Sequence, residues 1–265
     1  MQRRLIMRKK RKLVSIICTS ACLFLAIASL VGLFFTGMYV GWGPFKNLFW
    51  NQEVKRVKKS YSYEDNQEGI VFYGASNFRL WTEMNNDLSD YSIVNAGFGG
   101  STDKLLMQYA SDLLYPYHPK VIFFQTGSND YVEATGTDEE KIQSCMNHKK
   151  KMFETFHEKL PEAKMVIMSG LLLPGRKEYT SMALKINQEL EEYVTSFDYL
   201  YYVNANELTY DGTEYRLDLF IKDGIHLNHD GQLLWCENYI RPQIEKLILE
   251  HSELESLKKA KNQIM

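Results

Sequence analysis

Short apolar runs alternate with amphipathic stretches between residues 69 and 250. Within each run the apolar side chains are nearly continuous, which is typical of strands buried on both faces of a parallel sheet. The runs predict strands at 70–73, 92–95, 121–125, 165–169 and 200–203. The amphipathic stretches predict helices at 102–114, 138–160, 179–197 and 229–250, the second of them with a capped start at residues 137–140. This alternation predicts an α/β fold with a parallel sheet covered by helices on both faces.

The N-terminal part has a different pattern. The first 12 residues carry seven positive charges and no acid, and residues 13–45 contain no charged side chain. An uncharged apolar segment of this length is typical of a transmembrane helix, which we expect at 13–35. The basic segment 1–12 then stays in the cytoplasm and the remainder lies outside the membrane. The alternative is secretion after cleavage of a signal peptide near Ala26 to Ala28.

The other boundaries follow from composition. Residues 36–68 are expected to form a juxtamembrane tether, 69–250 the folded domain, and 251–265 a charged, solvated C-terminal extension. The chain has a net charge of −2 although its first 12 residues are strongly basic, so the remainder is acidic. Because the basic block belongs to the membrane segment, we expect no nucleic-acid partner.

Cysteine usage gives little indication of function. Only Cys145 and Cys236 lie in the predicted domain, so a disulfide is possible but is not indicated. The spacings typical of metal sites and of phosphate-binding loops do not occur in the sequence.

Polar loops follow the predicted strands. Ser76 comes directly after the first, "AGFGGST" after the second and "TGSND" after the third, while "KDGIHLNHDG" lies between the last strand and the last helix. In an open α/β sheet, ligands bind beyond the carboxyl ends of the strands. We therefore expect the four loops to meet at one edge of the sheet.

These loops bring the groups that acyl transfer requires. Ser76 is a candidate nucleophile, His226 a candidate base, and Asp223, three residues earlier, a candidate partner for the imidazole. The backbone at Gly100 and the side-chain amide of Asn129 are candidate donors to an oxyanion. Taken singly, each is also an ordinary turn residue or surface histidine. The enzymatic interpretation depends on all of them occurring together.

In four ordered blocks, "YGASNFRLW", "NAGFGGST", "TGSND" and "DGIHLN", the chain resembles an SGNH-type hydrolase of the GDSL esterase/lipase superfamily. The resemblance covers about residues 69–250. It implies a three-layer α/β/α flavodoxin-like fold with a central parallel five-stranded sheet, and no cofactor. By this resemblance Ser76, Asp223 and His226 form a catalytic triad. The N–H groups of Ser76 and Gly100 and the side chain of Asn129 form the oxyanion hole.

One residue departs from the family pattern. The first block of the family usually reads Gly-Asp-Ser, and here Ala75 stands in the middle position. The triad is unaffected, but a polar group beside the nucleophile is lost.

Three functional hypotheses remain. The first is a membrane-anchored, extracytoplasmic serine esterase acting on an acyl ester, such as an acylated glycan or a lipid of the cell envelope. The second is an O-acyltransferase that uses the same triad to acylate a cell-envelope glycan. The third is a non-catalytic carbohydrate-binding relative, which is favoured only by Ala75. The length of the acyl chain and the leaving alcohol are not indicated by the sequence.

Overall fold

The computed structural model describes residues 29, 32 and 46–259. Apart from residues 29 and 32, the predicted transmembrane segment 13–35 lies outside the described residues, as do the basic segment 1–12 and the chain end from 260 onward. In the part that is described, no helix combines the length and the apolar character needed to cross a bilayer. The chain divides between Lys55 and Arg56 into two units, and the architecture below is that of the second unit.

A five-stranded parallel sheet forms the centre of this unit, in the order β2-β1-β3-β4-β5. The strands are β1 (Ile70–Gly74), β2 (Ile93–Asn95), β3 (Val121–Gln125), β4 (Lys164–Met168) and β5 (Leu200–Val203). Each begins and ends within one residue of its predicted position. All residues of β1, β2 and β3 are buried, in accordance with their continuous apolar character.

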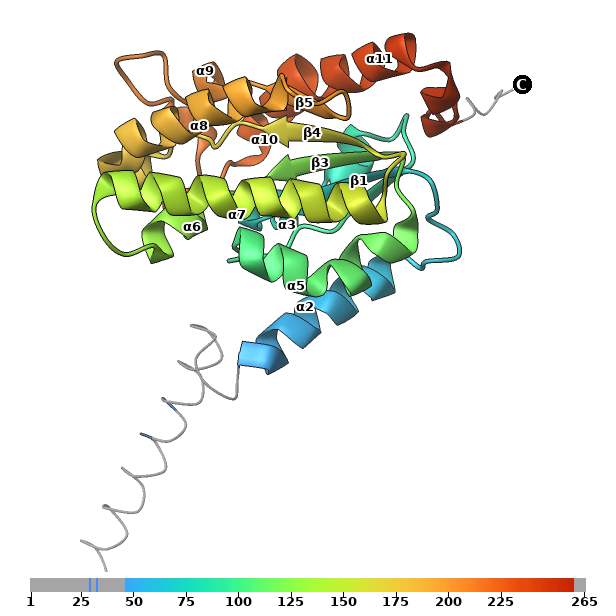
Figure 1. Cartoon of the computed structure of the whole chain (residues 1–265), viewed down its shortest axis with the longest axis horizontal. Helices are drawn as coiled ribbons and strands as arrows, with labels where there is room; N and C mark the ends of the chain where they lie inside the picture. Colours follow the sequence, from blue (N-terminus) through green and yellow to red (C-terminus); the bar gives the residue numbers. More distant parts are fainter. Residues whose placement is uncertain (1–28, 30–31, 33–45, 260–265) are drawn as a thin grey trace, which may run out of the picture. The chain divides into compact units, whose positions relative to one another are not determined.

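Helices cover both faces of the sheet (Figure 1). The longer ones are α5 (Asp103–Leu113), α7 (Asp138–Lys159), α8 (Thr180–Val194), α10 (His229–Trp235) and α11 (Arg241–Glu250). A further helix, α2 (Lys46–Ser60), spans the boundary between the two units. Short helices are α3 (Ser76–Arg79), α4 (Met84–Asp87), α6 (Ser128–Glu133) and α9 (Asn206–Thr209). A capping box starts α7, in which Thr137 and Glu140 each accept the backbone N–H of the other. The predicted three-layer α/β/α fold is confirmed.

The two faces of the sheet have separate aromatic cores. On one face Phe124 of β3 packs against Phe153 and Phe156 of α7, with ring centroids 5.7 and 5.6 Å apart. On the opposite face Phe78 of α3 stacks on Trp235 of α10 at 5.3 Å. Phe123, the neighbour of Phe124 in β3, belongs to this second core, because successive side chains of a strand point to opposite faces of the sheet.

The last helix differs from its prediction. The sequence predicts one continuous helix at 229–250, whereas a π-helical turn at Cys236–Ile240 separates α10 from α11. Pro242 lies in the first turn of α11. A proline has no N–H to donate to the preceding turn, and its ring clashes with the carbonyl four residues earlier, which accounts for the break.

The flanking segments also differ from their predictions. Part of the predicted tether is helical, and in residues 56–68 the Arg56 guanidinium donates to the Gly97 carbonyl at 2.6 Å and the Tyr63 hydroxyl to that of Asp112 at 2.7 Å. The expectation of a solvated C-terminal extension is wrong for residues 251–259. There Leu254 and Leu257 are buried, and the apolar area that they remove from water holds the segment on the domain.

Trp235 should contribute strongly to stability, because it is fully buried and stacks on Phe78 and Trp81. We expect Trp235→Ala to lower the free energy of unfolding by about 3–5 kcal/mol, through the cavity that it leaves. Urea denaturation monitored by circular dichroism would measure the change. Leu249→Ala is the control, since that side chain is 85% exposed and its loss should be nearly neutral. Equal midpoints for the two variants would contradict this packing.

Candidate active site

The loops after β1, β2 and β3 meet at the carboxyl edge of the sheet. Ser76 follows β1, which lies between β2 and β3 in the sheet, and Asn129 follows β3. The chain leaves β1 toward β2 on one side and returns to β3 on the other, so the strand order reverses between β1 and β3. Such a switch point opens a crevice in which doubly wound α/β proteins bind ligands.

A chain of two hydrogen bonds joins three residues that are distant in sequence. His226 Nε2 lies 2.8 Å from Ser76 Oγ, and His226 Nδ1 lies 2.6 Å from Asp223 Oδ2. The His226 side chain is 20% exposed and Ser76 is partly exposed, so neither is sealed from a substrate. The structure thus brings together the hydroxyl, imidazole and carboxylate that the sequence singled out.

A tight turn shapes the carboxylate end of this chain. Gly224 has a positive φ of 65°, a conformation that favours glycine, and Asp223 Oδ1 accepts the backbone N–H groups of Ile225 and His226 at 2.8 and 3.0 Å. Partial burial disfavours the Asp223 anion, but these two N–H groups and the His226 imidazole outweigh it and hold the pKa of Asp223 below its usual value. Asp223 is therefore an anion at neutral pH.

Asn77 fixes the distance between the serine and the histidine. Its side chain is buried, and Oδ1 accepts the backbone N–H of Leu227, the residue after His226, at 3.2 Å. Two neighbours of the reacting groups are thus tied together across the site. Sequence reasoning missed this residue, because an asparagine after a strand is also ordinary turn chemistry.

The loop after β2 approaches the start of α3 closely. A Cβ at Gly97 would lie 2.3 Å from the backbone N of Arg79, so no larger residue fits there. Gly100 has φ 71°, which also favours glycine. The Phe98 N–H donates to the Gly74 carbonyl at 2.8 Å, which holds this loop beside the end of β1. Both glycines therefore have structural reasons, and Gly100 lies in the loop that reaches the site.

Asn129 lies next to this loop. Its side-chain Nδ2 donates to the carbonyl of Ser101, the residue after Gly100, at 2.9 Å. Its Oδ1 accepts from the guanidinium of Arg176. The candidate donors of the second and third blocks are thus brought together, and Arg176 is a contact that the sequence analysis did not find.

A buried polar cluster contacts the loop that carries Asn129. Lys149 of α7 is 2% exposed, and its Nζ lies 3.1 Å from Asp103 Oδ2 and 2.5 Å from Thr126 Oγ1. Burial disfavours the ammonium, yet the carboxylates of Asp103 and Asp130 outweigh it and raise the pKa of Lys149. Lys149 therefore keeps its charge. Lys149 lies one helical turn after Cys145, which is also buried, so the helical periodicity of the sequence could have indicated that Lys149 is buried too.

Asp130 is the second carboxylate of this cluster. Its Oδ1 accepts the backbone N–H of Asp103 at 3.0 Å, and its buried Oδ2 has no hydrogen-bond partner among the described residues. Burial and the negative charge of Asp103 raise the pKa of Asp130 to about 7, against the opposing charge of Lys149. Near neutral pH, Asp130 thus changes between its neutral and charged forms.

This pKa predicts a pH-dependent stability. The folded-state pKa of Asp130 lies above its unfolded value of about 4. The stabilisation that Asp130 contributes is therefore fully present below about pH 4 and is lost as the pH rises through 7. Asp130→Asn imitates the protonated carboxyl at every pH. We expect this variant to gain stability over the wild type between about pH 5 and pH 8, by at most about 4 kcal/mol.

Urea denaturation at a series of pH values would test this prediction. Glu162→Gln is the control, because Glu162 is an exposed carboxylate that does not belong to this cluster and should show no such trend. A difference between Asp130→Asn and the wild type that stays constant with pH would contradict the raised pKa.

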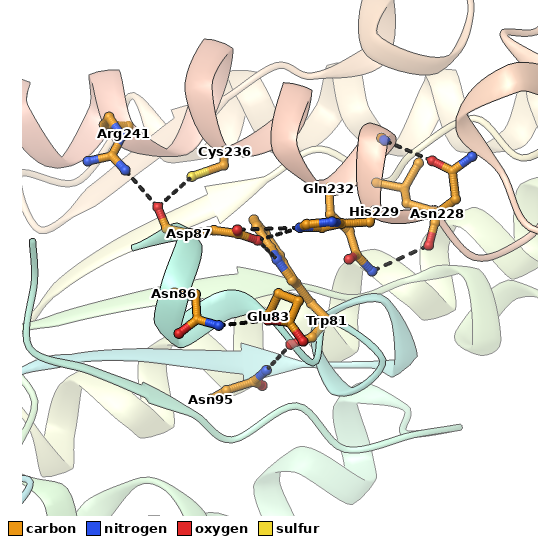
Figure 2. Close-up of polar contacts among 12 residues, drawn as sticks. Trp81, Glu83, Asn86, Asp87, Asn95, Asn228, His229, Gln232, Cys236 and Arg241 are labelled. Carbon is orange, nitrogen blue, oxygen red and sulfur yellow. Dashed lines mark hydrogen bonds and ion pairs between the residues drawn. The ribbon is translucent and has the colours of Figure 1, made fainter. Parts of the chain in front are cut away.

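A second histidine–aspartate pair lies close to the site in sequence (Figure 2). Asp87 Oδ2 accepts the Trp81 indole N–H at 2.6 Å and lies 3.2 Å from His229 Nε2, while the Arg241 guanidinium donates to the Asp87 carbonyl at 2.7 Å. Among the described residues no hydroxyl is hydrogen-bonded to His229. Asp87 thus joins the end of α4 to α10 and α11.

Ala75, the departure from the family pattern, is the N-cap residue of α3. It is 6% exposed, and its side chain provides no hydrogen bond to the helix end. Ser76 is therefore held by backbone contacts and by the link through Asn77, without a polar group at the preceding position.

Neither a metal-binding cluster nor a disulfide occurs among the described residues. Across residues 46–259 and the two earlier described positions, no group of three or more His, Cys, Asp or Glu side chains is arranged to hold a metal ion. Cys145 and Cys236 are both buried free thiols. Burial raises the pKa of each to about 12, so neither thiolate forms near neutral pH.

Solved structures with a similar fold come from several bacteria. A Streptococcus pneumonia protein described as a platelet activating factor has a TM-score of 0.60 and 17% identity, covering 80% of this chain and 95% of its own. A GDSL-like lipase from Bacteroides thetaiotaomicron has a TM-score of 0.52 and 18% identity, covering 73% and 97%. A variant of an acetyl-xylooligosaccharide esterase from Geobacillus Stearmophilus has a TM-score of 0.51 and 13% identity, covering 68% and 94%.

At these identities the structural neighbours establish the fold alone. The comparison with curated proteins found no match. The sequence profile of the GDSL-like lipase/acylhydrolase family, in contrast, matches residues 67–234, which is more than half of the chain and includes all four loops. The chain belongs to the GDSL-like lipase/acylhydrolase family and is an ester-hydrolysing enzyme.

Proposed function

We propose that the chain is a serine esterase in which Ser76, His226 and Asp223 act as nucleophile, base and orienting carboxylate. The observation that carries this proposal is the pair of hydrogen bonds from Ser76 Oγ through His226 to Asp223, at 2.8 and 2.6 Å. In acyl transfer a hydroxyl is deprotonated by an imidazole whose other nitrogen is held by a carboxylate. The three residues stand in that order.

In the first half of the reaction, Ser76 Oγ attacks the carbonyl carbon of the ester while its proton passes to His226 Nε2. The tetrahedral intermediate carries a negative oxygen, which the N–H groups of Ser76 and Gly100 and the Asn129 amide stabilise. When the intermediate collapses, the bond to the alcohol oxygen breaks and His226 returns the proton to that oxygen. The products are a free alcohol and an acyl-serine.

In the second half, water takes the place of the alcohol. His226 accepts a proton from the water as its oxygen attacks the acyl carbon, and the collapse of the second intermediate releases the acid and restores Ser76. The anionic Asp223 stabilises the imidazolium in both halves. None of these steps needs a metal or cofactor.

For the substrate we propose an acyl ester of an envelope or extracellular carbohydrate or lipid. The predicted membrane segment 13–35 and the basic residues before it support an anchored, extracytoplasmic enzyme. A fold similar to that of an acetyl-xylooligosaccharide esterase makes acetylated glycans the first class to test.

The test is product analysis. Purified protein would be incubated with a panel of acetylated oligosaccharides and with aryl esters of increasing acyl length, with and without an acceptor glycan. We expect free carboxylic acid in amounts that do not depend on the acceptor. Acyl groups appearing on the acceptor glycan would show a transferase instead. No product in any reaction would refute the proposal.

A further inference from the structure

A short connection links the aspartate turn to the asparagine loop. In the 3-10 helix Pro174–Tyr179, the N–H of Gly175 donates to the Gly224 carbonyl at 2.8 Å. A Cβ at Gly175 would lie 2.4 Å from the carbonyl oxygen of Asp223, so this close approach admits only glycine. The segment is thereby fixed to the turn that holds Asp223 and His226.

Arg176, the next residue, contacts the loop after β3. The Arg176 guanidinium donates through Nη1 to Ser128 Oγ at 2.8 Å. It also donates through Nη1 and Nη2 to Asn129 Oδ1, at 3.2 and 3.3 Å. Both nitrogens therefore converge on the oxygen of one side-chain amide. A planar guanidinium is suited to such two-point contacts, which a lysine ammonium does not reproduce.

These contacts determine the orientation of the Asn129 amide. An asparagine amide has an oxygen that accepts and a nitrogen with two N–H donors. Here the oxygen is held by Arg176, and one N–H donates to the Ser101 carbonyl at 2.9 Å. Rotating the amide by 180° would direct its NH₂ group at the guanidinium and its oxygen at a carbonyl, so both contacts would become repulsive. Among the described residues, no acceptor is hydrogen-bonded to the second N–H.

We infer that Arg176 is a positioning residue for the hydrolysis, which holds the Asn129 amide with its free N–H directed to the oxyanion. The inference rests on the proposed function. The guanidinium is always charged, and in the described part of the chain it forms no ion pair with a carboxylate. Its charge therefore acts on the amide oxygen, polarises the amide and strengthens the remaining N–H as a donor.

A double-mutant cycle with Arg176→Met and Asn129→Ala would test the inference on a small neutral aryl acetate. Asn129→Ala should lower kcat about a hundredfold, as expected for one oxyanion donor. Arg176→Met should lower kcat by about ten- to a hundredfold and leave KM within about twofold, since charged hydrogen bonds are of this strength. When Asn129 is already alanine, the same Arg176 change should have almost no further effect.

The cycle separates positioning from other roles of the arginine. If Arg176→Met lowers kcat by the same factor in both backgrounds, or changes only KM, the inference is wrong. Arg216→Met serves as a control, because Arg216 is an exposed arginine paired with Asp218 and should leave both constants unchanged. Thermal melting of each variant identifies any loss of folded protein.

A second measurement does not depend on turnover. The side-chain amide signals of Asn129, assigned in a ¹H–¹⁵N spectrum by their loss in Asn129→Ala, should shift strongly in Arg176→Met and remain in place in Arg216→Met. Unshifted Asn129 signals in Arg176→Met would overturn the inference even in an active enzyme. Failure of the wild type to hydrolyse any ester would instead refute the proposed function, and these signals would still report on the contact.

Discussion

Replacing Ser76 by alanine is expected to lower kcat on a small aryl ester by about 10⁴- to 10⁶-fold. The alanine has no oxygen to attack the carbonyl carbon, so no acyl-enzyme can form. What remains is the smaller acceleration due to binding and the oxyanion donors. Because Ser76 is partly exposed and the change removes only a hydroxyl, the variant should fold like the wild type.

Initial rates with an aryl acetate would measure this change. Ser196→Ala is the matched control, since that serine is exposed in the turn directly after α8 and the variant should retain full activity. Melting temperatures should agree for the wild type and both variants. Hydrolysis by Ser76→Ala at more than about a tenth of the wild-type rate would show that another group is the nucleophile.

The second large effect is expected for Asp223→Asn, which should lower kcat by about 10³- to 10⁴-fold. In the wild type, Oδ1 accepts two backbone N–H groups and Oδ2 faces His226 Nδ1. An asparagine that keeps its oxygen on those N–H groups must direct its NH₂ at Nδ1. The imidazole then carries its proton on Nε2, where it faces Ser76 and cannot accept the hydroxyl proton.

Rates for this variant would be compared with those of Asp218→Asn, in which an exposed, ion-paired carboxylate is changed in the same way and activity should persist. Rates would be compared at neutral pH, where the lowered pKa of Asp223 keeps its carboxylate ionised. A loss of less than about tenfold in Asp223→Asn would mean that the carboxylate does not orient the base.

The sheet could be predicted from the sequence because strands buried on both faces leave a continuous apolar signal. The five predicted strands and the strand–helix alternation define a doubly wound fold with few alternatives. The break at the π-helical turn before Pro242 was missed because the hydrophobic periodicity continues through it. Leu254 and Leu257 were missed for the opposite reason, since two apolar residues in a charged segment give no periodic signal.

For the site, the sequence could indicate residues whose type the chemistry selects, but not residues that geometry alone selects. Ser76, Asp223 and His226 could be proposed because acyl transfer needs these groups, and the structure places them in hydrogen-bond contact. Asn77 and Arg176 position other residues through contacts across distant parts of the chain. Such contacts depend on how the loops pack, and neither residue lies in a pattern that indicates its partner.

Covalent labelling with a fluorophosphonate probe would test the central claim most directly. The activated hydroxyl of Ser76 should displace fluoride and retain one phosphonyl group, and peptide mass spectrometry should locate it on Ser76 alone. His226→Ala should abolish the labelling, because no base remains to accept the Ser76 proton. A protein that remains unlabelled, or that carries the phosphonyl group on another residue, would contradict the proposed triad.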